Sequence, residues 1–116
     1  MATQRVPEEF TNTAVSNADL SAKNLYFAQI QSDGTVDLPG ADGVVNGVIQ
    51  EGAATGLSTT YQFGGIAKVV TGAGVRAGQK VASDALGRAV EGSTNSPGTA
   101  ITSVDSAGMV VEVQLG

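Results

Sequence analysis

The sequence contains no cysteine, no histidine and no tryptophan, and these absences exclude several kinds of chemistry. Without cysteine there is neither a disulfide nor a thiol nucleophile. Without histidine, Ser-His-Asp triads, Cys-His dyads and histidine-ligated zinc sites cannot form. A small enzyme would have to work with carboxylates, hydroxyls and lysines alone, so we expect a protein with no catalytic activity and no cofactor.

Charged residues and long apolar runs are also scarce. Charged residues make up 15% of the 116 residues, and the formal net charge is −5. The lysines and arginines are scattered singly, whereas nucleic-acid binding requires clustered basic residues. No apolar run approaches the ~20 residues of a membrane span, and the first ten residues, MATQRVPEEF, lack the apolar core of a signal peptide. We therefore expect neither nucleic acid nor a membrane as a partner.

Glycine, in contrast, is abundant, with 16 residues. Residues 64–90 alternate short segments rich in valine and isoleucine, which favour strands, with glycines that suit turns. No segment shows a sustained helical period. The sequence therefore predicts an all-β fold with one domain over residues 18–116, a small compact barrel or sandwich, and an extended arm over residues 1–17.

The arm is predicted because residues 1–17 show no sustained period of 2 or 3.6. Pro7 blocks a helix, and Val6 and Phe10 are the only sizeable apolar side chains before Val15. One interpretation is a segment that becomes ordered on a partner, and the other is an ordinary frayed terminus. The sequence favours neither.

Short strands are predicted throughout the domain. Residues 24–31 and 35–38 form a hairpin around Asp33-Gly34. Residues 44–50 form the next strand, in which we interpret Asn46-Gly47 as a bulge rather than a second turn. The remaining predicted strands cover residues 59–63, 66–71, 79–82, 88–90, 100–104 and 109–115.

Two motifs resemble ligand sites without meeting their requirements. Asp33, Asp37 and Asp42 lack the Asp-x-[Asp/Asn]-x-[Asp/Asn]-Gly spacing of a calcium loop, so we interpret them as turn residues. Residues 72–77 match the G-x-G-x-x-A pattern of dinucleotide sites. That pattern requires a helix to begin there, and Gly78 and the strand pattern after it indicate a turn instead.

The order of the short motifs is similar to that of a known family. The motifs are ADLSAK, DGTV, GVIQ, GIAKV, AGQKV, SDALGRAV and VVEV, at residues 18–23, 33–36, 47–50, 65–69, 77–81, 83–90 and 110–113. Together they resemble the small head decoration proteins of tailed bacteriophages, also called capsid cement proteins. Residues 98–104 depart from the family pattern, because they lack the acidic residue that members often carry before the last strand.

The resemblance implies a β-tulip-like domain that binds, as a homotrimer, the outer surface of an expanded phage head. There it would bridge major capsid protein subunits and stabilise the shell by binding only its assembled form. It would be made in the bacterial host cytoplasm and used in the virion. We expect the arm to add a strand to a capsid subunit, with Arg5, Val6, Pro7 and Phe10 as the capsid-binding residues.

The alternative is another virion or tail module that binds carbohydrate or protein on the host surface. Such a module would need an exposed aromatic platform, for which the candidates are Tyr26, Phe27, Tyr61 and Phe63. Because side chains alternate between the two faces of a strand, we expect at least half of these four to lie in the core or in subunit contacts.

Overall fold

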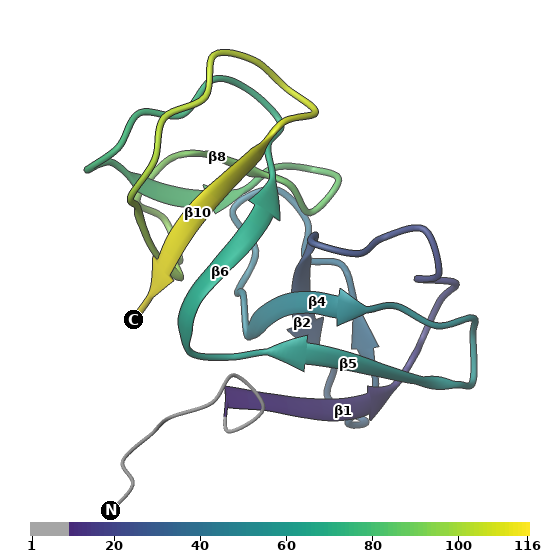
Figure 1. Cartoon of the computed structure of the whole chain (residues 1–116). Helices are drawn as coiled ribbons and strands as arrows, with labels where there is room; N and C mark the ends of the chain where they lie inside the picture. Colours follow the sequence, from purple (N-terminus) through teal and green to yellow (C-terminus); the bar gives the residue numbers. More distant parts are fainter. Residues whose placement is uncertain (1–9) are drawn as a thin grey trace, which may run out of the picture.

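A computed structural model describes residues 10–116, which form two five-stranded antiparallel sheets and contain no α-helix (Figure 1). The predicted all-β fold is confirmed. The first sheet contains β1 (Thr11–Val15), β2 (Phe27–Ile30), β3 (Val36–Asp37), β4 (Gly47–Glu51) and β5 (Ser58–Gln62). The second contains β6 (Gly65–Val70), β7 (Lys80–Ser83), β8 (Ala89–Glu91), β9 (Gly98–Ala100) and β10 (Val110–Leu115). Across residues 10–116, no helix is long and apolar enough to cross a membrane.

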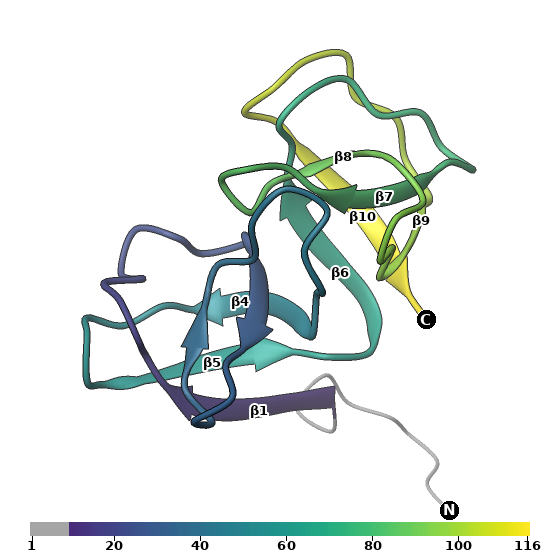
Figure 2. The same cartoon turned by 180° about the vertical axis from the view of Figure 1, so that it is seen from behind.

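The two sheets repeat the same topology. The first has the order β1-β5-β4-β2-β3 and the second has the order β6-β10-β9-β7-β8. If β6 to β10 are renumbered as β1 to β5 in chain order, the strand order of the second sheet becomes the same as that of the first. The chain is therefore built from two equivalent halves that follow one another, which lie side by side in Figures 1 and 2.

Each half closes its sheet in the same way. A parallel bridge joins the residue after the first strand to the third strand: Ser16 to Val36 in the first half and Thr71 to Ala89 in the second. Both Ser16 and Thr71 are buried. The bridges bring the two outer strands of each sheet together, so each half is a small barrel rather than an open sheet.

The hydrogen bonds around the two bridges also match. The Gly56 N–H donates to the Ser16 carbonyl at 2.9 Å, and the Gly108 N–H donates to the Thr71 carbonyl at 2.8 Å. Both glycines adopt a positive φ, +87° and +78°, a conformation that other residues enter at a cost. The equivalence of the halves thus extends from strand order to individual turns.

One apolar cluster joins the halves. It contains Phe27 and Val48 from the first half together with buried valines and alanines of the second. The Phe27 side chain is 0% exposed, and its N–H donates to the Gly87 carbonyl at 2.8 Å. Gly87 ends the turn before β8, where the Asp84 carboxylate accepts hydrogen bonds from the Leu86 and Arg88 N–H groups.

A second cluster belongs to the first half alone. Leu20, Ala28, Val36 and Ile49 form its buried part. Tyr26 and Tyr61 pack against this cluster and are partly buried. The first half therefore has an interior of its own, but its largest buried side chain, Phe27, lies outside that interior.

The predicted hairpin around Asp33-Gly34 is present. β2 pairs with β3, and Gln31 and Thr35 flank a three-residue loop in which the Gly34 N–H donates to the Gln31 carbonyl at 2.9 Å. The predicted bulge at Asn46-Gly47 was wrong, because the irregularity lies between Ile49 and Glu51.

Several predicted boundaries also differ: besides shifts of up to three residues at the ends of strands such as β2 and β4, two places stand out. Thr11–Val15, placed within the arm, forms β1 and pairs with β5 along the edge of the first sheet. β9 ends at Ala100 rather than Val104. In both places the alternation of polar and apolar side chains is weak, so backbone pairing sets the boundary.

We predict that Phe27→Ala lowers the free energy of unfolding by about 3–5 kcal/mol, because it leaves a cavity between the halves. Phe63→Ala is the matched control, since that phenylalanine is 48% exposed, and it should cost less than about 1 kcal/mol. Urea denaturation followed by circular dichroism measures both. Equal losses for the two variants would show that Phe27 does not join the halves.

Candidate functional site

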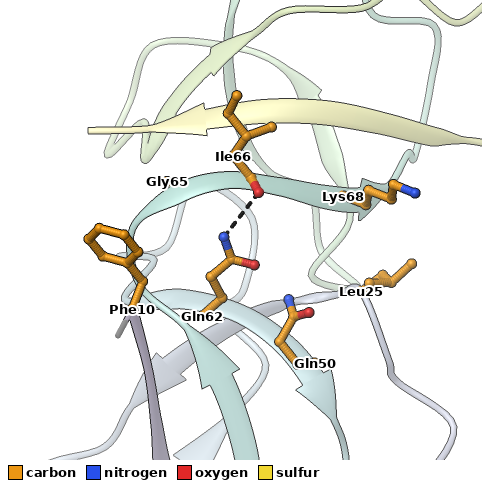
Figure 3. Close-up of a pocket in the computed structure, with 7 residues that line it drawn as sticks. All are labelled: Phe10, Leu25, Gln50, Gln62, Gly65, Ile66 and Lys68. Atoms are coloured by element: carbon orange, nitrogen blue, oxygen red, sulfur yellow. Dashed lines mark hydrogen bonds between the residues drawn. The ribbon is translucent and has the colours of Figure 1, made fainter. Parts of the chain in front are cut away.

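A pocket of about 420 Å³ lies between the two halves. It is lined by Phe10, Leu25, Gln50, Gln62, Gly65, Ile66 and Lys68 (Figure 3). Phe10 lies at one end and Leu25 at the other, with β6 running between them along one wall. The pocket therefore follows the length of a strand.

Phe10 links the pocket to the edge strand β1. Its carbonyl accepts a hydrogen bond from the Phe63 N–H at 2.7 Å, which continues the β1–β5 ladder by one residue. Its ring meets the Phe63 ring edge-on, with the centroids 6.3 Å apart, and lies so close to Gly64 that a methyl group there would be 2.7 Å from it. Phe10 is thus held in place from both sides.

Gln62 organises the floor of the pocket. Its side chain is 8% exposed, and its amide nitrogen donates to the Gly64 carbonyl at 2.7 Å and to the Ile66 carbonyl at 3.0 Å. These bonds hold the bend that connects β5 to β6. Figure 3 shows the second of them as a dashed line across the pocket.

The far end of the pocket is closed by Leu25. This residue has a φ of +71°, unusual for a side chain of its size. Its N–H donates to the Ile49 carbonyl at 2.7 Å, and its carbonyl accepts from the Val70 N–H at 2.9 Å. The strained residue is therefore bonded on both sides and connects β4 of the first half with β6 of the second.

One of the four predicted capsid-binding residues lies within the described residues 10–116, and three do not. Arg5, Val6 and Pro7 lie outside the described residues, whereas Phe10 lines the pocket. The structure brings Phe10 together with Gln62, Ile66 and Lys68. Sequence reasoning did not single out these last three as site residues: Gln62 belongs to no motif, and Ile66 and Lys68 appear only as strand residues of the GIAKV motif.

The aromatic candidates for a glycan platform are dispersed. Phe27 is fully buried, and Tyr26 and Tyr61 pack against the core of the first half. Phe63 is the one largely exposed member of the four. The expectation that at least half of them pack inside is confirmed, and they do not form a flat binding surface.

The three aspartates considered for calcium do not converge: Asp33 and Asp37 accept hydrogen bonds from their own chain neighbours, and Asp42 lies in a separate turn with a φ of +56°. Asp33 accepts hydrogen bonds from the Thr35 hydroxyl and, more weakly, from the Thr35 N–H, and both lower its pKa. Asp37 accepts from the Leu38 N–H. In residues 10–116, no group of three or more carboxylates is placed to hold a metal ion.

The G-x-G-x-x-A motif lies in a loop. Gly72 and Gly74 are followed by Val75, which bridges to Val104 rather than starting a helix. No helix N-terminus is available there to face a pyrophosphate.

Two other carboxylates have lowered pKa values. Hydrogen bonds from the Ser21 hydroxyl and N–H lower the pKa of Asp19. The pKa of Glu91 is lowered mainly by its side-chain hydrogen bonds with Arg76, at 3.1 and 3.2 Å, and further by the Arg76 N–H at 2.8 Å. The same pair raises the pKa of Arg76. Glu91 thereby ties the loop before β7 to the end of β8.

Comparison with known proteins identifies the fold. No protein-family model matches the sequence, and no curated protein matches it. The structure is similar to the crystal structure of the head fiber gp8.5 N base in bacteriophage phi29, with a TM-score of 0.71 and 16% sequence identity. The similarity covers 91% of this chain and 92% of that one. This chain has the fold of a phage head fiber base. The predicted resemblance to a phage head protein is confirmed at the level of the fold.

We predict that Gln62→Leu lowers the free energy of unfolding by about 1–3 kcal/mol, because it leaves the Gly64 and Ile66 carbonyls without their donor. Gln50→Leu is the matched control on the neighbouring strand β4, since the Gln50 amide makes one marginal bond, 3.5 Å from the Val48 carbonyl. It should change stability by less than about 0.5 kcal/mol. Urea denaturation compares the two, and similar losses would refute the role of Gln62.

The Glu91–Arg76 pair should make stability depend on pH in the acidic range. Because the folded-state pKa of Glu91 is lowered, its stabilisation is present at neutral pH and is lost as the pH falls through that pKa. Glu91→Gln should therefore be less stable than wild type at pH 7 and converge with it as the pH falls below that lowered pKa. Glu51→Gln, at an exposed strand end without an ion pair in residues 10–116, is the matched control and should be as stable as wild type at pH 7. A Glu91→Gln deficit that persisted at low pH would contradict the ion pair.

Proposed function

We propose that this chain is a non-enzymatic structural protein of a tailed-phage head that binds the outer surface of the capsid. The supporting observation is that its fold matches the head fiber gp8.5 N base over almost the whole of both chains. The motif order in the sequence points independently to head decoration proteins. The fold of the backbone and the order of the sequence motifs thus point separately to the phage head.

Within this role we propose a cement function. A homotrimer that binds the major capsid protein of the expanded shell bridges neighbouring subunits, and three simultaneous attachments make each weak contact effective. A protein that binds the expanded shell alone stabilises that form by mass action. The compact, helix-free domain of residues 10–116 suits a role in which binding surface rather than chemistry matters.

The arm is the proposed attachment point. It precedes β1, an edge strand of the first sheet, so residues 1–9 can be engaged by a partner without disturbing the pairing of β1 with β5. Of the four residues expected to bind the capsid, Arg5, Val6 and Pro7 belong to this segment, and Phe10 anchors it to the domain through Phe63.

We predict that deleting residues 2–9 leaves the domain folded but weakens binding to expanded heads on the order of a hundredfold, because each subunit loses its attachment. The measurement is co-sedimentation with expanded and immature heads of the phage that encodes the chain, with circular dichroism to verify folding. Sedimentation equilibrium of the wild-type protein tests the trimer.

A control variant, Thr3→Ala, keeps the length of the arm and should bind as wild type does. Equal binding of the deletion variant and wild type would remove the arm from the interface. Equal binding of wild type to both kinds of head, or to neither, would contradict the cement function itself.

A further inference from the structure

The outer face of β6 and β10 is the surface of the second half that points away from its barrel interior. Inward-pointing residues of these strands, such as Val69 and Val111, are fully buried. β6 and β10 lie at the front in Figure 1 and behind β7, β8 and β9 in Figure 2, so the rest of the barrel covers only their inner side. The outer face consists of the register pairs Val70–Val110, Lys68–Glu112 and Ile66–Gln114.

This outer face exposes aliphatic side chains to water. Ile66 is 56% exposed and Val110 is 44% exposed, and Val70, beside Val110, is half-buried. Ile101, which is also exposed, extends the face on the other side of β10, because its N–H donates to the Glu112 carbonyl at 2.9 Å. Single exposed aliphatic residues need no explanation, whereas a group of neighbouring ones marks an interaction surface.

The first half provides an internal comparison for this surface. The equivalent face of β1 and β5 consists of the register pairs Val15–Ser58, Thr13–Thr60 and Thr11–Gln62. Four of these six residues are threonine or serine, and Val15 is the one aliphatic member. In the second half the corresponding positions hold three aliphatic residues, Ile66, Val70 and Val110. Because the same topology forms with a polar face, folding alone does not require the aliphatic one.

One positive and one negative side chain lie side by side in the middle of the face. Lys68 is exposed and Glu112, directly opposite it on the neighbouring strand, is half-buried. Among residues 10–116, neither of them belongs to an ion pair. Such a surface can complement itself, because a second copy of the chain presents a Glu112 carboxylate to the Lys68 ammonium group of the first.

We propose that the outer face of β6 and β10 is the surface through which three copies of this chain contact one another. Each copy turns this face toward a three-fold axis, and Lys68 of one subunit lies opposite Glu112 of the next. The inference rests on the homotrimer of the proposed function and names the surface that forms it.

The order of the strands suits a ring of three. β6 lies on one side of β10 and β9 lies on the other. Lys68 therefore lies toward one side of the face, and Glu112 and Ile101 lie toward the other. A rotation by one third of a turn brings unlike sides of two copies together, which is the arrangement that closes a cyclic trimer.

The residue types favour a second copy over an unrelated partner. Val70, Val110 and Ile66 exclude water around the charged pair, which strengthens the attraction between its members. An unpaired charge in such a contact would be costly. A second copy supplies both the carboxylate and the ammonium group at the required spacing through symmetry alone, so every Lys68 in the ring meets one Glu112.

The first experiment measures the mass of the full chain by sedimentation equilibrium, with circular dichroism to verify folding. Val110→Asp should weaken association about a hundredfold, because it brings three like charges together in an apolar contact. Ser58→Asp is the matched control, since Ser58 pairs with Val15 in the first half as Val110 pairs with Val70 in the second. It should associate as wild type does.

The second experiment tests the contact between subunits directly. The chain has no cysteine, so a Lys68→Cys variant and a Glu112→Cys variant each carry a single thiol and cannot form a disulfide within one chain. Refolded together and oxidised, the two variants should form a linked dimer on a non-reducing gel faster than either variant does alone, because a disulfide requires the two residues to lie close together.

The outcomes separate this inference from the proposed function. A trimer in which Val110→Asp and Ser58→Asp behave alike, or in which the mixed cysteine variants cross-link no faster than either alone, would overturn the assigned surface and leave the trimer standing. A wild-type protein that stays monomeric or dimeric at every concentration would overturn the inference together with the trimer. Co-sedimentation with expanded heads tests capsid binding independently of both results.

Discussion

The burial of Phe27 across the junction is the interaction on which the rest of the molecule depends. Phe27 is a residue of β2 in the first half, but its side chain packs into the core formed mainly by the second half. Its N–H binds the Gly87 carbonyl, and that carbonyl is positioned by a turn that Asp84 holds through two backbone N–H groups. Backbone bonds from Val70 to Leu25 and from Asp42 to Ser83, each 2.9 Å, lie along the same junction. Because the halves are joined at one shared cluster rather than by two full sheet faces, the loss of one aromatic ring should weaken the whole junction.

The pocket is a consequence of repeating one topology twice in a row. Each half begins with an edge strand, and the second half begins where the first one ends. β6 therefore presents its open edge to the end of β5, with Gln62 at the bend and Leu25 at the far side. Its equivalent, β1, has no preceding half among the described residues and presents its open edge to the outside. The same strand position thus produces an internal pocket in one half and an outer edge in the other.

Glycine and alternating valines were enough to predict an all-β fold and most strand positions. The hairpin at Gly34 was predicted because turn residues act locally. The bulge was misplaced because Asn46 lies before β4 rather than inside a strand. There its N–H binds the Ala28 carbonyl, and its side chain accepts from the Ile30 N–H. The repeat was not predicted, since equivalent positions share backbone bonds more than residue types. Gly34 and Gly87 occupy the same turn position, but the carbonyl that each N–H binds belongs to Gln31 in one half and to Asp84 in the other. The pocket was not predicted for a related reason. Gln62 shapes it by donating hydrogen bonds to the Gly64 and Ile66 carbonyls, and no sequence motif indicates such bonds.

The sharing of Phe27 has a consequence for the order in which the chain acquires its structure. The first half is contiguous in sequence and has its own cluster around Leu20 and Ile49, so it can form while the second half is still being synthesised. Until residues 67–113 follow, however, Phe27 and Val48 have no core to enter. The half-made protein would expose its largest buried side chain, that of Phe27 at the start of β2. Synthesis of the second half therefore does more than add a domain: it ends the period in which the first half is prone to aggregate.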